Sequence, residues 1–77
     1  MQLDILTPDK ALFSGDVTSV ILPGSKGQFE ILNSHAAIVS SLDKGTIKVK
    51  TADGKTQLFE VSGGVVEVQD NKIVVLA

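Results

Sequence analysis

The chain has 77 residues, a length that allows one domain with a small core, because a chain this short buries only about 60 to 65% of its unfolded surface. A hydrophobic fraction of 43% with 21% charged residues is ordinary for a globular domain. The absence of cysteine excludes disulfides and thiolate metal sites, and a net charge of −2 without any arginine argues against nucleic-acid binding.

The N-terminal residues, "MQLDILTPDK", lack the basic segment and apolar stretch of a secretion signal and the arginine-rich character of an organelle presequence. No apolar run approaches the roughly 20 residues that a membrane helix requires. We therefore expect neither a membrane span nor a signal or transit peptide, and we expect the protein to act in the compartment where it is made.

Short β-branched runs separated by turn residues follow one another along the chain, a pattern typical of a β-sandwich or barrel. The alternation is clearest at 46–50, where Ile47 and Val49 share one face and two lysines share the other. No segment has the apolar period of an amphipathic helix. We predict strands at residues 2–7, 11–14, 17–22, 28–32, 36–42, 45–51, 56–62, 64–69 and 72–77. The predicted fold is all-β, a small antiparallel sandwich.

Glycine and asparagine mark the predicted turns. Asp53-Gly54 lies between two alternating runs and predicts a type I′ hairpin turn, and Asp70-Asn71 predicts the same before the last strand. Gly15 predicts a bulge or bend, and Gly63-Gly64 a bulge or a close approach of two backbones. The last run, 72–77, is almost entirely apolar, so we expect it to be buried on both sides or covered by a partner.

His35 is the single histidine and lies in a polar notch between two apolar runs, 29–32 and 36–39. A histidine in this position can be a catalytic base, a metal ligand or a turn residue. Catalysis would require an orienting carboxylate or a nucleophile, and metal binding at least two more strong ligands. Because the chain has no second histidine and no cysteine, we favour the turn residue.

The remaining polar motifs also indicate structure rather than chemistry. The nine acidic residues occupy turns, strand ends or outward strand positions, where solvated carboxylates are usual. The "GSKG" segment, 24–27, lacks the spacing of a phosphate-binding loop and the helix that would follow it. The sequence therefore predicts no catalytic residue, no metal, no cofactor and no bound nucleotide.

Three separated segments, "FSGDV", "GSKGQFEILNSHAAIVSSLDKG" and "VSGGVVEVQDNKIVVLA", together resemble the N-terminal β-sandwich domain of the epsilon subunit of F-type ATP synthase. The resemblance covers residues 1–77 and implies a flattened sandwich of two roughly five-stranded sheets. It also implies a non-catalytic rotor subunit that links the gamma subunit to the membrane rotor ring of a proton-translocating synthase. Such a subunit lies at the cytoplasmic face of the bacterial inner membrane and reaches the membrane only through the complex.

The resemblance assigns contacts to two segments. It implies a gamma-subunit interface at His35, Ala36, Ile38 and Ser40. It implies a rotor-ring interface at Ser25, Lys26 and Gln28. The chain departs from the family pattern at Ala37, where a proline is usual. It also ends at "VVLA", where many members continue into two helices that inhibit ATP hydrolysis, so that regulation is not expected from these residues.

Two other classes of protein remain as alternatives. A free-standing β-sandwich could bind a carbohydrate or a peptide, but carbohydrate modules usually present aromatic platforms, and this chain has three phenylalanines and neither tryptophan nor tyrosine. An enzyme is the third possibility, and the sequence offers it no set of catalytic residues.

Overall fold

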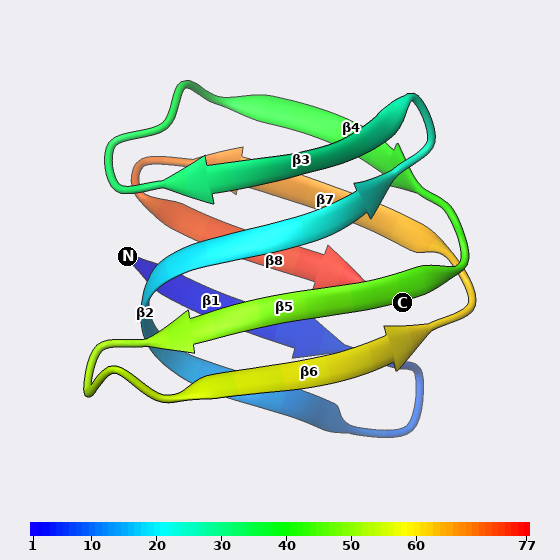
Figure 1. The fold of residues 1–77 in the computed structure, drawn as a ribbon. Helices are drawn as coiled ribbons and strands as arrows, with labels where there is room; N and C mark the ends of the chain where they lie inside the picture. Colours follow the sequence, from blue (N-terminus) through cyan, green and yellow to red (C-terminus); the bar gives the residue numbers. More distant parts are fainter.

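Eight strands and the turns between them make up the fold of the computed structural model, which describes residues 1–77 throughout (Figure 1). The strands are β1 (Gln2–Leu6), β2 (Ala11–Gly24), β3 (Gly27–Leu32), β4 (Ile38–Leu42), β5 (Gly45–Thr51), β6 (Thr56–Val61), β7 (Gly64–Gln69) and β8 (Lys72–Leu76). The chain has no helix, so it has none that is long and apolar enough to cross a membrane.

The strands form two layers that share β2 (Figure 1). The front layer contains β3, the second half of β2, β5 and β6. The back layer contains β4, β7, β8, β1 and the first half of β2. The sandwich predicted from the sequence is therefore confirmed, with four strand segments in one layer and five in the other. Its dimensions of 27 × 25 × 19 Å make it moderately flattened.

β2 is one strand of 14 residues, where the sequence predicted two strands interrupted at Gly15. The irregularities lie elsewhere: β2 has an extra residue opposite β1 at Leu12 and another opposite β5 at Thr18. These bulges bend and twist the strand where it passes from the back layer to the front layer. The backbone of Gly15 stays extended, and its missing side chain leaves room for the Phe13 ring, which lies 3.4 Å from a Cβ built there.

The sheet is not purely antiparallel, which corrects the sequence-based prediction. β1 and β8 pair in parallel, with Gln2 opposite Lys72 and Leu6 opposite Leu76. A parallel pair cannot be joined by a tight hairpin. Here nearly the whole chain lies between the two strands, which is long enough to bring them side by side in parallel. The alternation of side chains along each strand does not indicate whether its partner runs parallel or antiparallel.

The core lies between the two layers and consists of aliphatic side chains from every strand. Fourteen buried hydrophobic residues form it: Leu3, Ile5, Val17, Val20, Leu22, Ile31, Leu42, Ile47, Val49, Val61, Val66, Val68, Ile73 and Val75. No polar or charged residue is buried among them. Phe13 and Phe59 close one side of the core with an edge-to-face contact, their ring centroids 5.8 Å apart.

Both predicted hairpins occur, but one has a different turn. At Asp70-Asn71, φ is 52° and 62°, as a type I′ turn requires. At Asp53-Gly54 only Gly54 has a positive φ, 87°, and its N–H bonds the Thr51 carbonyl at 2.9 Å. This is a three-residue loop in which a glycine with positive φ follows the turn, so the type I′ assignment was wrong.

The loops gather at two opposite ends of the sandwich (Figure 1). At the left end in the figure lie the β3–β4 loop, the β5–β6 hairpin and the β7–β8 turn. At the right end lie the β2–β3 turn, the β4–β5 loop and the β6–β7 crossover. The two segments to which the resemblance assigned contacts, 35–40 and 25–28, thus begin at opposite ends of the molecule.

Candidate functional site

His35 lies in the loop between β3 and β4, half-buried, and its hydrogen bonds are local. Its N–H donates to the Leu32 carbonyl at 3.2 Å. Its ring Nδ1 lies 2.7 Å from the Ala36 carbonyl oxygen, which can only accept, so Nδ1 carries the proton and donates. Nε2 makes no hydrogen bond within the chain. The His35 ring makes no hydrogen bond or ion pair with a carboxylate or a hydroxyl group, so its geometry is that of a turn residue.

The backbone of this loop is fixed by a residue that the sequence analysis did not single out as functional. The Asn71 side chain, in the β7–β8 turn, accepts from the Ser34 N–H at 3.0 Å and donates to Asn33 Oδ1 at 2.9 Å. Ser34 has a φ of 63°, a conformation that is uncommon for a residue with a side chain. The β3–β4 loop and the β7–β8 turn therefore form one hydrogen-bonded unit.

The structure separates the four residues proposed for the gamma interface. Ala36 is exposed and His35 half-buried, both in the loop before β4. Ile38 and Ser40 pair with the buried Val68 and Val66, and directly opposed residues share a face, so both side chains point toward the core. β4 begins at Ile38 instead of residue 36. Because side chains alternate along a strand, the residue between Ile38 and Ser40 points outward.

Val39 is that outward residue, and 70% of its surface is exposed. It belongs to a group of apolar side chains on the outer face of the back layer, which we call the outer apolar patch. Pairing places its members on the same face: Val39 and Val74 are both opposite Glu67, Val65 is opposite Leu76, and Leu76 is opposite Leu6. A shallow depression of about 150 Å³ runs between Val39, Val65, Val74 and Leu76, and the Glu67 side chain also lines it. The last strand is thus buried on its inner side only.

The three residues proposed for the rotor-ring interface lie together at the right end. The Ser25 hydroxyl donates to Asp43 at 3.1 Å and accepts from Ser41 at 2.9 Å. These bonds connect the β2–β3 turn to the β4–β5 loop, so Ser25 holds the turn in place. Lys26 and Gln28 are exposed and make no side-chain hydrogen bond or ion pair within the chain.

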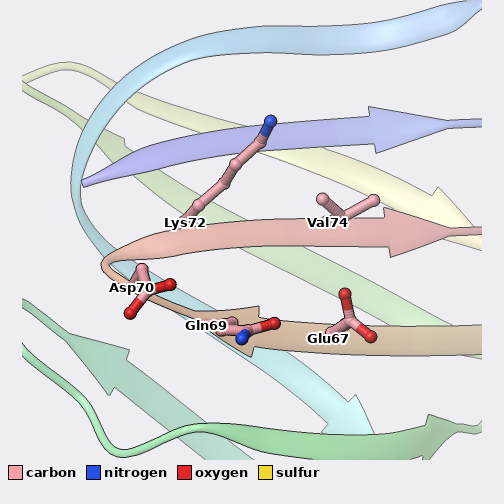
Figure 2. Close-up of a pocket in the computed structure, with 5 residues that line it drawn as sticks. All are labelled: Glu67, Gln69, Asp70, Lys72 and Val74. Atoms are coloured by element: carbon pink, nitrogen blue, oxygen red, sulfur yellow. The ribbon is translucent and has the colours of Figure 1, made fainter.

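The largest depression on the surface is a polar hollow of about 410 Å³ over β7 and β8. Figure 2 shows the side chains that line it, which come from the two strands and the turn between them: Glu67, Gln69, Asp70, Lys72 and Val74. The hollow is open to solvent. No three histidine, cysteine or acidic side chains in the chain are grouped so that they could hold a metal ion.

Two carboxyl groups have a lowered pKa, and ordinary hydrogen bonds explain both. The Ser14 hydroxyl, then the Gln2 amide, holds the pKa of Asp4 below its usual value, and the charge of Lys72 adds to this. The Thr51 hydroxyl does the same for the pKa of Asp53 in the β5–β6 hairpin. Neither carboxyl lines a depression of the surface, so these pKa shifts reflect local hydrogen bonding and do not indicate a catalytic acid or base.

These features define a small β-sandwich with loops at two opposite ends and an outer face that carries both the outer apolar patch and a polar hollow. The ATP synthase delta/epsilon chain β-sandwich domain family matches the chain over residues 1–77. The chain is 43% identical over 75 residues to the ATP synthase epsilon chain of Chlorobium limicola and 44% identical over 77 residues to that of Wolinella succinogenes. The protein therefore belongs to the ATP synthase epsilon chain family.

The relatives differ in length. The aligned region covers 97% of this chain and 85% of the Chlorobium limicola protein. It covers 100% of this chain but only 59% of the Wolinella succinogenes protein. The chain thus spans nearly all of some relatives and about three fifths of others.

Solved structures show the same fold. A chain in the cryo-EM structure of the Euglena gracilis mitochondrial ATP synthase, described as OSCP/F1/c-ring in rotational state 1, superimposes with a TM-score of 0.88 at 22% identity. A chain in the Tetrahymena thermophila mitochondrial ATP synthase central stalk/c-ring gives a TM-score of 0.82 at 23% identity. The matches cover 97% and 99% of this chain and 48% and 61% of the solved chains.

Proposed function

We propose that the protein is a non-catalytic rotor subunit in the central stalk of a proton-translocating F-type ATP synthase, where it links the gamma subunit to the membrane rotor ring. The observation that carries the proposal is the match of the whole chain to the epsilon family at about 40% identity. The two solved structures with the same fold come from complexes that contain a c-ring. In a bacterial cell this subunit would lie at the cytoplasmic face of the inner membrane.

The gamma subunit would bind the left end and the outer face of the back layer. His35 and Ala36 remain the contacts proposed for the loop. Along β4, Val39 takes the place of Ile38 and Ser40, because its side chain is the one that a covering partner can reach. The outer apolar patch would then lose its exposure on assembly, as is usual for the core of a stable interface.

The rotor ring would meet the right end through Lys26 and Gln28, both exposed polar side chains at or beside the β2–β3 turn. Ser25 contributes by holding that turn against Asp43. Single exposed contacts are typically worth under about 1 kcal/mol. This interface would therefore depend on several weak contacts. Binding to gamma would also hold the subunit next to the ring.

A pair of charge substitutions tests the proposal. We expect Ala36→Glu to abolish co-purification with the gamma subunit, because an unpaired carboxylate in a covered patch costs several kcal/mol. Lys26→Glu should leave gamma binding intact and weaken ATP-driven proton pumping in membrane vesicles. Circular dichroism checks that both variants fold. Loss of gamma binding in Lys26→Glu with retention in Ala36→Glu would mean that the two ends are assigned in reverse.

A further inference from the structure

Asn71 connects the β7–β8 turn to the loop that carries His35, through bonds to residues 37 and 38 positions earlier in the sequence. We infer that Asn71 is the positioning residue for this loop: its side chain fixes residues 33–36 in the conformation that a partner binds. The inference about binding rests on the proposed function, since this loop is one of the proposed contacts with gamma. The ordering of the loop can be tested without any partner.

Both the oxygen and the nitrogen of the Asn71 side-chain amide make hydrogen bonds to the loop. Its Oδ1 accepts from the Ser34 N–H at 3.0 Å, and its Nδ2 donates to Asn33 Oδ1 at 2.9 Å. The Asn71 carbonyl oxygen also accepts from the Gln2 N–H at 3.2 Å, which anchors the turn on the start of β1. One residue thus joins the loop, the turn and the first strand.

The conformation of the turn suits Asn71 to this role. A type I′ turn requires a positive φ at both central residues, and asparagine accepts this conformation more readily than most residues with a side chain. Asp70, the other central residue, has a φ of 52°, but its side chain makes no hydrogen bond. Both positions therefore require a positive φ, but only the Asn71 side chain makes hydrogen bonds to the loop.

The loop has little else to hold it. Residues 33–37 belong to no strand, and Ser34 has a positive φ of 63°. Apart from the bonds to Asn71, the loop makes the His35 N–H bond to Leu32, the last residue of β3, and the His35 ring bond to Ala36. Without Asn71 the loop would keep these bonds to sequence neighbours but lose its hydrogen bonds to the β7–β8 turn.

A loop that is fixed before binding loses less conformational freedom on binding, and affinity rises for this reason alone. Such effects appear mainly in the dissociation rate of a complex. The inference therefore predicts that loss of the Asn71 side chain weakens gamma binding although the loop contacts, His35 and Ala36, are unchanged.

Three variants of the full chain distinguish the effect of the Asn71 side-chain hydrogen bonds from the effect of the turn conformation. Asn71→Gly keeps the positive φ and removes both side-chain bonds. Asp70→Gly is the matched control, since it makes the same change at the neighbouring turn position where no side-chain bond exists. Asn71→Asp is the conservative variant, because its carboxylate still accepts from the Ser34 N–H, and the Asn33 amide can turn over to donate to the second oxygen.

Amide hydrogen exchange measured by NMR gives the first readout. In Asn71→Gly we expect the Ser34 amide to exchange at least about fivefold faster, as loss of one hydrogen bond implies. In Asp70→Gly and Asn71→Asp the Ser34 amide should keep the parent rate. Buried strand amides such as that of Val66 should be equally protected in all four proteins. Unchanged exchange of Ser34 in Asn71→Gly would overturn the inference.

The dissociation rate from the gamma subunit of the same source gives the second readout, measured by surface plasmon resonance. We expect it to rise at least about fivefold in Asn71→Gly and to stay within about twofold of the parent in Asp70→Gly, in line with the loss of pre-organisation. Faster Ser34 exchange with an unchanged dissociation rate would overturn the positioning role. A parent chain that does not bind gamma would contradict the proposed function, while the exchange of Ser34 would still decide whether Asn71 orders the loop.

Discussion

Gly64 shows how strongly one position can depend on having no side chain. It begins β7 directly after the crossover from β6, with a φ of 144°. A Cβ at this position would lie 2.3 Å from the Leu76 carbonyl oxygen. We expect Gly64→Ala to lower the free energy of unfolding by about 2 to 5 kcal/mol, because it combines backbone strain with a steric clash. Urea unfolding followed by circular dichroism measures the loss.

Gly54→Ala is the control for backbone strain without a clash. Gly54 also has a positive φ, 87°, but a Cβ there would meet no atom within 4 Å. The expected loss is about 1 to 2 kcal/mol, the cost of a left-handed conformation for a residue with a side chain. Equal losses in the two variants would show that the approach of the Leu76 carbonyl has no energetic consequence.

Asp4 gives a prediction about pH. Its carboxylate accepts from the Ser14 hydroxyl at 2.7 Å and from Gln2 Nε2 at 3.1 Å, and these bonds lower its pKa. Because the folded-state pKa is depressed, the stabilisation is present above the ordinary aspartate pKa of about 3.9. It is lost as the pH falls through the lower folded-state value.

Ser14→Ala removes the stronger of these two bonds, so we expect the pKa of Asp4 to rise toward the ordinary value. Titration of the Asp4 carboxyl carbon by NMR measures it. Asp53, whose pKa is lowered by Thr51 in a separate hairpin, should titrate as in the parent and serves as an internal control. If Asp4 titrated identically in both proteins, the Ser14 bond would not persist in solution.

Along the single strand β8, inward-facing side chains stabilise the fold and outward-facing side chains are available for binding. Ile73 is fully buried, whereas Leu76 is 56% exposed on the outer face. We expect Ile73→Ala to cost about 2 to 5 kcal/mol of folding free energy, since it leaves a cavity in the core. Leu76→Ala should cost less than about 1 kcal/mol, because little of its surface is withdrawn from water. Denaturant unfolding of both variants compares them; a large loss in Leu76→Ala would contradict its outward placement.

Strand periodicity predicted most of the elements, because alternation and turn residues are local signals. β5 and β7 begin and end where the sequence placed them. β2 was divided in two because a glycine was interpreted as an interruption, whereas the bends lie at Leu12 and Thr18, set by which strands β2 pairs with. The parallel pairing of β1 with β8 depends on contacts across the whole chain and left no local sign.

The candidate site was less predictable than the fold. Ile38 and Ser40 were assigned to the gamma interface by the resemblance. In the structure both lie opposite buried valines and face the core, and Val39 between them is the exposed member of the strand. Asn71 was recognised as a turn residue, but its bonds to Ser34 and Asn33 join distant parts of the chain, which no local pattern reveals. Ser25 is exposed, and the sequence alone did not indicate its hydrogen bonds to Asp43 and Ser41, which are 18 and 16 residues away.

At the scale of the whole molecule, the two outer faces are chemically different. The back layer carries the outer apolar patch, with Val39 and Leu76 both mostly exposed, beside the polar hollow over β7 and β8. The front layer carries Lys48, Lys50 and Glu30 around a polar depression, with Leu58 exposed at its edge strand β6. Because apolar surface gathered on one face usually marks an interaction site, the back layer is the face that we expect gamma to cover.

Val39 and Leu58 form a matched pair for testing this asymmetry, since both are exposed aliphatic residues in the outer face of a strand, at 70% and 64%. Neither contributes to the core, so both Val39→Glu and Leu58→Glu should fold. Val39→Glu places its carboxylate opposite Glu67, so its melting temperature should fall slightly. Leu58→Glu lies opposite Lys48 and should melt close to the parent. We expect Val39→Glu to weaken gamma binding by at least about a hundredfold, since a carboxylate covered without a partner costs several kcal/mol. Leu58→Glu should leave the affinity within about threefold of the parent, a change typical of positions outside an interface. Isothermal titration of each variant with gamma measures both values, and a greater loss in Leu58→Glu than in Val39→Glu would move the proposed interface to the front layer.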